Sequence, residues 1–324
     1  MSIYLRLLEW GPRVTKYSAM ASLSHRQGWS LAVLLVFFPC LLCARADNDV
    51  PPLNFRTGTS EVRVSFFATD GNNHAVDSIE RDDFAVLDGD MVIRDFRSLA
   101  RSDETKLDIT VLVDTSESVA PRFHTISEQV LDVIHRNDSG DDLSIITFAG
   151  LRPAVLCTAD CGGSSIEHKI LSLNPSGATP LFDSLAFSAQ FVGSRHAPGV
   201  RPVLILLSDG NDTISGTSAR HALDAVVASG ALLYTINPNK TSRDLRGSLV
   251  LQEMAEATGG RSFSARDDVT DVLEAALADL RASYVVTYAL PSRAAGFHSL
   301  RILPKHNLNL RFHCRRGYFY DEVR

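Results

Sequence analysis

The sequence lacks several features that mark common functional classes. It has no basic stripe: residues 1–46 hold five Lys/Arg and one Glu, a net of +4, so the −6 of the whole chain leaves −10 for residues 47–324. An acidic body of this kind argues against a nucleic-acid partner. The sequence also has no phosphate-binding P-loop, no Gly-x-Ser-x-Gly elbow and no His-Glu-x-x-His pair. It therefore offers no motif typical of an ATPase, an α/β-hydrolase or a zinc protease.

Cysteine is also scarce, with five residues in the chain. Cys40 and Cys43 lie in the apolar N-terminal run, and the three that remain, Cys157, Cys161 and Cys314, contain no paired Cys-x-x-Cys motif. This excludes the usual structural zinc site. Cys157 and Cys161 bracket only three residues in a predicted loop. They form either a small disulfide outside the cytoplasm or two free thiols, and the sequence leaves both alternatives open. Cys314 has no obvious partner.

The N-terminal segment has the three parts of a secretory signal. Arg26 precedes an apolar run over residues 31–43, and the small-x-small end Ala44-Arg45-Ala46 follows. The run is too short to span a bilayer comfortably, although a buried helix or a membrane anchor is an alternative. We expect cleavage after Ala46, which makes residues 1–46 a signal peptide and the mature protein secreted or periplasmic with no direct membrane span. We hypothesise that Met20 is the true start, because the signal is otherwise unusually long.

Two β-rich flanks enclose a central α/β segment. Residues 47–54 are a predicted linker. Residues 55–100 form the first flank and residues 283–324 the second, each with short alternating apolar runs. The predicted strands of the flanks lie at 61–69, 84–87, 92–96, 284–290, 299–303 and 308–313. Each flank alone would expose sheet edges. We therefore expect the two flanks to form one β-sandwich that the central domain interrupts.

Residues 105–282 alternate apolar strands with amphipathic helices. The strands are predicted at 107–114, 143–148, 203–208 and 232–236, and the helices from 121, from 179–180, and over 218–228, 245–257 and 269–281. Continuous apolar strands indicate burial on both faces. This pattern predicts an α/β fold with a doubly wound, mostly parallel sheet.

A carboxylate and two hydroxyls stand at alternate positions after the first of these strands. Asp114, Ser116 and Ser118 follow the apolar run 107–113, at a strand end where α/β proteins bind ligands. Such oxygen donors suit Mg²⁺, Mn²⁺ or Ca²⁺ better than a soft metal. Thr179 precedes a proline and is a predicted N-cap residue, and Asp209 ends a later apolar strand. Taken individually, Asp114 could only cap the following helix, Thr179 could be only an N-cap residue, and Asp209 could only belong to a turn.

Together, these residues resemble the metal-ion-dependent adhesion site of von Willebrand factor type A domains. Asp114, Ser116 and Ser118 match the first motif of that site. Residues 176–183 are similar to the family's threonine loop, which points to Thr179, and residues 207–210 to its second aspartate loop, which points to Asp209. The three pieces occur in the family's order.

The resemblance implies a divalent metal site with a fixed division of roles. Ser116 and Ser118 would bind Mg²⁺ directly, Thr179 directly or through water, and Asp114 and Asp209 often through water. A vacant position would take an Asp or Glu of a protein partner. Glu117, which lies between the two serines, replaces the glycine that is common in relatives.

The flanks extend the resemblance to a more specific family. Residues 82–89, 253–260, 284–288 and 316–318 are similar to the secreted bacterial family related to von Willebrand factor type A domains and known chiefly from Acidobacteria. The likeness covers roughly residues 55–320. It implies an architecture and does not identify a ligand.

We therefore expect an extracytoplasmic, divalent-metal-dependent protein-binding module of the adhesion type, and not an enzyme. The alternatives are a structural or assembly protein with a vestigial metal site and a metal-dependent hydrolase. The histidines are scattered and none lies at a motif position, which disfavours the hydrolase. The sequence does not indicate the partner's identity, the ion or the oligomeric state.

Overall fold

The computed structural model describes residues 61–102, 106–137, 141–159, 161–195, 197–238, 245–264 and 269–320. The predicted signal peptide, the hypothetical start at Met20 and the predicted linker lie outside these residues. Within the described part of the chain, no helix is long and apolar enough to cross a membrane.

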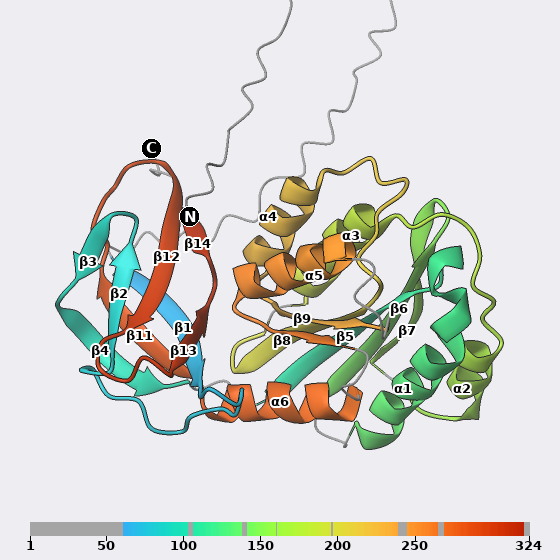
Figure 1. Ribbon diagram of the computed structural model, residues 1–324, viewed down its shortest axis with the longest axis horizontal. Coiled ribbons are helices and arrows are strands. Elements are labelled where there is room, and N and C mark those ends of the chain that lie inside the picture. Colours follow the sequence, from blue (N-terminus) through green and yellow to red (C-terminus); the bar gives the residue numbers. More distant parts are fainter. Residues whose placement is uncertain are drawn as a thin grey trace, which may run out of the picture. The chain divides into compact units, whose positions relative to one another are not determined.

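A six-stranded sheet forms the centre of the α/β segment. Its strands are β5 (Lys106–Asp114), β6 (Asp142–Ala149), β7 (Arg152–Ala159), β8 (Val200–Leu207), β9 (Leu232–Asn237) and β10 (Ser262–Ser264). They lie in the order β10-β9-β8-β5-β6-β7, and only β7 is antiparallel to its neighbour (Figure 1). The predicted doubly wound, mostly parallel sheet is confirmed.

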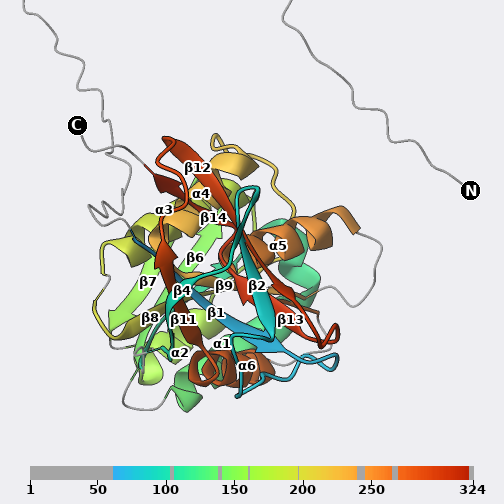
Figure 2. The ribbon, with the colours of Figure 1, turned by 90° about the vertical axis from the view of Figure 1, so that its left-hand side faces the viewer.

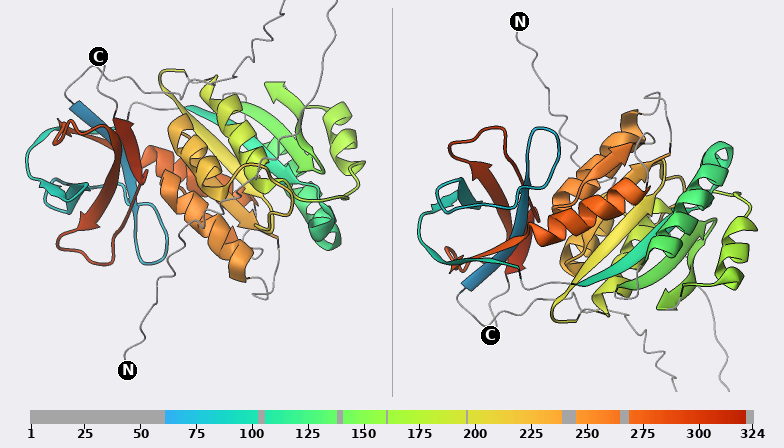
Figure 3. Two further views of the ribbon diagram at one scale, coloured as in Figure 1. Left: turned by 90° about the horizontal axis from the view of Figure 1, so that it is seen from above. Right: turned by 90° about the horizontal axis from the view of Figure 1, so that it is seen from below.

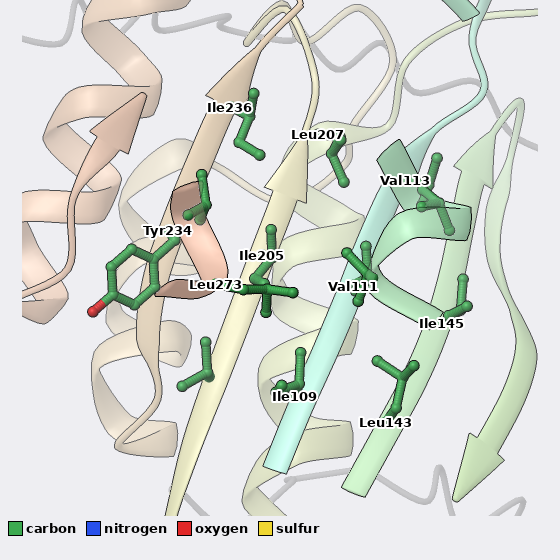
Figure 4. Packing of buried hydrophobic residues seen from close by; sticks show 14 of the residues in the cluster. Ile109, Val111, Val113, Leu143, Ile145, Ile205, Leu207, Tyr234, Ile236 and Leu273 are labelled. Carbon is green, nitrogen blue, oxygen red and sulfur yellow. The ribbon is translucent and has the colours of Figure 1, made fainter. Parts of the chain in front are cut away.

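Helices cover both faces of this sheet (Figure 3). One face carries α1 (Phe123–Arg136), α2 (Ser164–Leu171) and α6 (Val269–Arg281), and the other carries α3 (Leu181–Gly193), α4 (Ala219–Ser229) and α5 (Leu245–Thr258). The alternation of side chains along a strand divides β5 between the two cores. Ile109, Val111 and Val113 pack in the first core (Figure 4), and Leu112 packs in the second.

The two flanks interleave in two antiparallel sheets. The strands are β1 (Glu61–Thr69), β2 (Phe84–Asp88), β3 (Met91–Ile93), β4 (Phe96–Arg101), β11 (Tyr284–Ala289), β12 (Gly296–Pro304), β13 (Arg311–Cys314) and β14 (Gly317–Tyr320). The sheets have the orders β13-β1-β11-β4 and β14-β12-β2-β3, so each combines both flanks (Figure 2). They share an apolar core that includes Phe66, Phe84 and Tyr288. The predicted single β-sandwich is confirmed.

Some local predictions were wrong or incomplete. The single strand predicted over 92–96 is two strands, because β3 ends at Ile93 and β4 begins at Phe96 in the other sheet. The segment at Cys157, predicted as a loop, is part of β7, and Cys157 forms a disulfide with Cys161. Cys314 is free, and burial raises the pKa of its thiol to about 12. The short elements α2 and β10 were not predicted.

The α/β segment leaves and re-enters the sandwich at neighbouring strands. Arg101 of β4 pairs with Tyr284 of β11, and the Ser102 amide donates to the Ser283 carbonyl at 2.9 Å. A second contact holds the two parts together at the turn after α5. Gly259 has φ +87°, and a Cβ there would lie 2.8 Å from the Cys314 backbone. Only glycine fits this close approach of two backbones.

A buried ion pair also joins the two parts. Asp279 of α6 is fully buried and accepts hydrogen bonds from Arg261 Nε and Nη2 at 3.1 and 3.0 Å. The Tyr234 hydroxyl of β9 donates to the same carboxylate at 2.7 Å, and Arg261 Nη1 donates to the Asn73 carbonyl of the sandwich at 2.8 Å. Burial raises the pKa of Asp279 to about 6, against the lowering influence of Arg261 and Tyr234.

His313 of β13 lies at the same junction. Its ring stacks on Phe67 with a centroid distance of 4.7 Å, and its Nε2 lies 2.9 Å from Thr69 Oγ1. Burial lowers the pKa of His313 to about 4, and the charges of Arg261 and Arg311 lower it further. The imidazole is therefore neutral in the folded protein at pH 7.

We expect His313 to make the protein sensitive to acid. The unfolded imidazole has a pKa of about 6.5, so the unfolded chain binds more protons than the folded chain between pH 6.5 and 4. The stability that neutral His313 contributes is present above pH 6.5 and falls by about 3 kcal/mol as the pH falls to 4. His313→Phe keeps the stacked ring and removes the titration. Urea unfolding at both pH values should therefore show the variant gaining that amount relative to the native protein.

The exposed His306 provides the matched control. His306→Phe should follow the native protein at both pH values, because it changes an exposed side chain that lies outside the apolar core. A His313→Phe variant whose stability difference from the native protein is the same at pH 7 and pH 4 would refute this account.

Candidate functional site

The candidate site lies where the sheet changes its winding direction. The central strand β5 has β6 on one side and β8 on the other. Asp114 is the last residue of β5, and Ser208 follows the last residue of β8. Val113 pairs with Leu207, so Asp114 and Ser208 come next to each other at the carboxyl edge. Ligands of doubly wound folds bind at this kind of switch point.

The first loop fixes Asp114 and brings two serine hydroxyls together. The Ser116 amide donates to Asp114 Oδ1 at 2.9 Å, and the hydroxyl oxygens of Ser116 and Ser118 lie 3.1 Å apart. A 3₁₀ helix, η1 (Glu117–Arg122), begins directly after Ser116, whose side chain makes no capping hydrogen bond. Asp114 and Ser116 are buried, whereas Glu117 and Ser118 are exposed.

Reciprocal backbone bonds attach the threonine loop to the first loop. The Ser176 amide donates to the Thr115 carbonyl at 2.9 Å, and the Glu117 amide donates to the Gly177 carbonyl at 3.0 Å. The β6–β7 turn supports the threonine loop through the Gly150 amide, which donates to the Ala178 carbonyl at 2.8 Å. Thr179, which is 2% exposed, is thus held at the same edge of the sheet as Ser116.

The prediction that Thr179 is the N-cap of the next helix is wrong. Helix α3 begins at Leu181, with Pro180 at the N-cap position. The first amides of the helix are satisfied from the following loop instead, because Ser215 Oγ accepts from Phe182 and Asp183 at 3.0 and 3.1 Å. Asp212 also accepts from Phe182 and from Ser215. Asp212 is therefore a capping residue.

The third loop contacts both of the others. The Ser208 hydroxyl donates to Asp114 Oδ2 at 2.7 Å and accepts from the Gly210 amide at 3.2 Å. Asp209 is 3% exposed, and its Oδ1 accepts from the Asn211 amide at 3.0 Å. The Thr213 amide donates to the Thr179 carbonyl at 2.9 Å, and the Thr179 amide donates to Thr213 Oγ1 at 2.7 Å.

The structure thus brings all five predicted residues to one edge of the sheet on three mutually bonded loops. The sequence reasoning missed Ser208, the residue that orients Asp114, although it directly precedes Asp209. The sequence signal that could have found Ser208 was its position directly after a predicted strand, because a residue at that position in a strand parallel to and next to β5 lies beside Asp114. Whether the five residues ligate a metal remains a prediction.

The carboxylate groups of Asp114 and Asp209 lie close together in a buried environment. Burial raises the pKa of Asp114, and the nearby Asp209 carboxylate raises it further. Hydrogen bonds from Ser116 and Ser208 act in the opposite direction, because they stabilise the ionised form. A bound cation would relieve the repulsion between Asp114 and Asp209.

The oxygen atoms of the five side chains suit a hard cation, and the three hydroxyl groups would be needed as ligands beside the carboxylates. Among the described residues, no group of three or more His, Cys, Asp or Glu is placed to hold a metal ion. A metal would therefore depend on Ser116, Ser118 and Thr179 beside the two carboxylates. Neighbouring ligands of octahedral Mg²⁺, each about 2.1 Å from the ion, lie about 3.0 Å apart. The 3.1 Å between the Ser116 and Ser118 hydroxyls agrees with that spacing.

A family model matches the part of the chain that holds these residues. Residues 109–211 match the model of the von Willebrand factor type A domain. The matched range includes Asp114, Ser116, Ser118, Thr179 and Asp209. The curated proteins contain no significant match to this chain.

Similar solved structures include proteins from bacteria and from a mussel. An aerotolerance-related membrane protein from Bacteroides fragilis is 19% identical over 54% of this chain and 98% of its own, with a TM-score of 0.42. BatB from Bacteroides thetaiotaomicron is 18% identical over 52% of this chain and 98% of its own, with a TM-score of 0.40. Proximal thread matrix protein 1 from the mussel byssus is 19% identical over 59% of this chain and 50% of its own, with a TM-score of 0.42.

Proposed function

We propose, on the premise that residues 109–211 form a von Willebrand factor type A domain, that this protein is an extracytoplasmic protein-binding module. In this proposal, a divalent ion bridges the domain to an Asp or Glu on a protein partner. The observation that supports the proposal most is that hydrogen bonds join three loops, distant in sequence, next to Asp114. These loops carry the five oxygen-bearing side chains at the carboxyl edge of the sheet. Von Willebrand factor type A domains typically mediate protein interactions.

The side chains divide into ligands and supports. Ser116, Ser118 and Thr179 would hold Mg²⁺, Mn²⁺ or Ca²⁺ through their hydroxyl oxygens, and Asp114 and Asp209 would balance its charge. Ser208 keeps Asp114 oriented through the bond to Oδ2. A carboxylate of the partner would then bind directly to the positively charged ion. Glu117 is exposed and lies between Ser116 and Ser118 in the sequence, and its negative charge would repel acidic partners that do not reach the ion.

We propose a binding role and not a catalytic one. Five histidines of the described ranges have side-chain partners elsewhere: His74 with Asp70, His124 with Glu128, His135 with Glu167, His298 with Asp88 and His313 with Thr69. None of these five contacts includes Ser116 or Ser118. The Cys157–Cys161 disulfide supports an oxidising compartment, and thus the proposed export. Membership in the secreted bacterial family belongs to the same proposal.

Removing one exposed hydroxyl should weaken metal binding without unfolding the protein. Ser118→Ala deletes an oxygen that lies 3.1 Å from Ser116 Oγ, and Ser118 contributes nothing to the apolar core. We expect its affinity for Mn²⁺, measured by the loss of free-ion signal in electron paramagnetic resonance, to fall at least ten-fold. Ser194→Ala removes an equally exposed serine after α3 and should bind Mn²⁺ like the native protein.

Capture of partners tests the bridging step. Native protein immobilised in millimolar Mg²⁺ should retain a partner that EDTA releases, and Asp114→Ala should retain none while its circular dichroism stays native. Equal capture by native protein and Asp114→Ala would refute the bridge. A native protein that binds no Mn²⁺ at millimolar concentration would instead favour a structural or assembly role with a vestigial site.

A further inference from the structure

The β-sandwich has a groove that the proposed metal site does not use. The groove lies on the face of the sheet β13-β1-β11-β4 that is opposite the sandwich core and has a volume of about 510 Å³. Pockets that bind ligands typically have volumes of about 300–1,000 Å³. Eight residues line it: Glu61, Arg63, Arg97, Ser98, Ala100, Arg101, Val285 and Thr287.

The groove is hollow because its floor is made of small side chains and its walls of long ones. Arg63, Thr287 and Ser98 form one row across β1, β11 and β4. The next row places Val285 beside Ala100. The short side chains of these rows leave room between the arginines. Strand β4 is the last strand of its sheet, so the groove is open on that side.

A β-bulge places a further arginine beside this row. The register between β11 and β4 shifts at Thr287 and Tyr288, so that Phe96 pairs with Tyr288 and Ser98 with Thr287. Arg97 is therefore the additional residue of β4 at the bulge. It forms an ion pair with Glu61, and the Arg97 and Glu61 side chains remain 49% and 39% exposed.

Three arginines and one glutamate line the groove. Arg101 pairs with Tyr284 of the sandwich core. The charges on the groove's own face are therefore those of Arg63, Arg97 and Glu61, a net of +1. Arg101 is committed to the fold, since its Nη1 donates to the Arg281 carbonyl at 2.8 Å and its guanidinium lies over the Tyr284 ring. Arg63 and Arg97 are exposed and remain for a ligand. Arg63 on β1 and Arg97 on β4 belong to strands on either side of β11, so their backbones are about 10 Å apart.

We propose that this groove binds an extended acidic peptide segment that presents at least two carboxylates. Arginine forks pair with carboxylates through two parallel hydrogen bonds. Side chains on one face of an extended peptide repeat about every 6.6 Å, so two carboxylates of one segment can each pair with a separate arginine across the groove. A carboxylate of the ligand would replace Glu61 on Arg97, and a second would pair with Arg63. The proposal does not depend on the metal site.

Fluorescence anisotropy with a fluorescein-labelled hexaglutamate peptide tests the proposal. The assay contains EDTA and about 20 mM salt, so that the candidate metal site cannot hold the peptide and screening is weak. We expect Arg63→Gln/Arg97→Gln to bind at least ten-fold more weakly than the native protein. Arg311→Gln, an exposed arginine at the far end of β1's partner β13, should change the affinity less than two-fold.

Glu61→Gln provides a gain-of-function test that a folding defect cannot imitate. Removing the carboxylate that competes for Arg97 should raise the affinity about three-fold. The proposal is overturned if the double arginine variant binds like the native protein, or if labelled hexaglutamine binds as well as hexaglutamate. Displacement of the peptide by inorganic phosphate as effectively as by unlabelled hexaglutamate would overturn it too, since it would indicate a general anion surface.

Discussion

Replacing Asp279 by alanine is expected to lower the free energy of unfolding by about 3–5 kcal/mol. The carboxylate has no exposed surface and accepts hydrogen bonds from Arg261 and Tyr234. Alanine would leave the Arg261 guanidinium as a buried charge without its counter-ion, and the Tyr234 hydroxyl without its acceptor. The cost comes from these stranded partners, because an intact buried ion pair contributes little net stability.

The consequence should extend beyond α6. Arg261 also donates to the Asn73 carbonyl, and its guanidinium lies 6.0 Å from the Phe67 ring centroid and 5.5 Å from that of Phe263. The ion pair therefore connects the last helix of the α/β segment with the β1–β2 connection of the sandwich. We expect Asp279→Ala to increase amide hydrogen exchange on both sides of this junction.

Urea unfolding at pH 8, above the pKa of about 6 for Asp279, measures the effect with the carboxylate ionised. Glu274→Ala removes an exposed carboxylate from the same helix and should change stability by less than about 0.5 kcal/mol. Replacing all three groups, by Arg261→Met, Asp279→Leu and Tyr234→Phe, should recover much of the loss, since no charge is left unpaired. A loss below 1 kcal/mol in Asp279→Ala would contradict the argument.

Gly210→Ala is expected to cost about 2–4 kcal/mol and to remove metal binding. Gly210 has φ +82°, a left-handed conformation that costs other residues about 1–2 kcal/mol. A Cβ there would lie 2.2 Å from the Gly247 carbonyl oxygen of α5, and overpacking of this kind costs about 1–3 kcal/mol. The loop would have to move away from α5. Ser208 and Asp209, which precede Gly210 directly, would move with it.

The same loop supplies the control. Gly216 has no neighbour within 4 Å of an added Cβ, so Gly216→Ala should keep native stability and native Mn²⁺ affinity. Differential scanning calorimetry and Mn²⁺ titration of both variants separate the two effects. If Gly210→Ala bound Mn²⁺ with native affinity, the third loop would have no part in the site.

The sequence was sufficient to predict the architecture because burial on both faces makes strands such as β5 and β8 continuously apolar. It was also sufficient to place Asp114, Ser116 and Ser118, since a strand end and alternating polar positions are local features. The spacing of residues along the chain did not predict that Thr179 and Asp209 would lie near these three residues. Their placement came from the order of motifs in a known family.

The incorrect local predictions also have physical causes. The capping of α3 by Ser215 and Asp212 arises from a loop more than 30 residues away, so the local Thr-Pro pattern misassigned the cap to Thr179. β7 was missed because the cysteine spacing suggested a loop, whereas only Cys161 lies beyond the strand. The break between Ile93 and Phe96 depends on which sheet each strand joins, and no local pattern records that choice.

The split of the sandwich between two distant flanks has a consequence for synthesis. Strands β1 to β4 leave the ribosome before residues 106–281, and the strands that pair with them, β11, β12 and β13, follow only afterwards. At about 5–20 residues per second, this interval lasts roughly 9–35 s. During that time the first four strands have unpaired edges that can associate with other nascent chains. A slow elongation rate would therefore favour misassembly of the sandwich, while the α/β segment, whose strands are contiguous, could already be native.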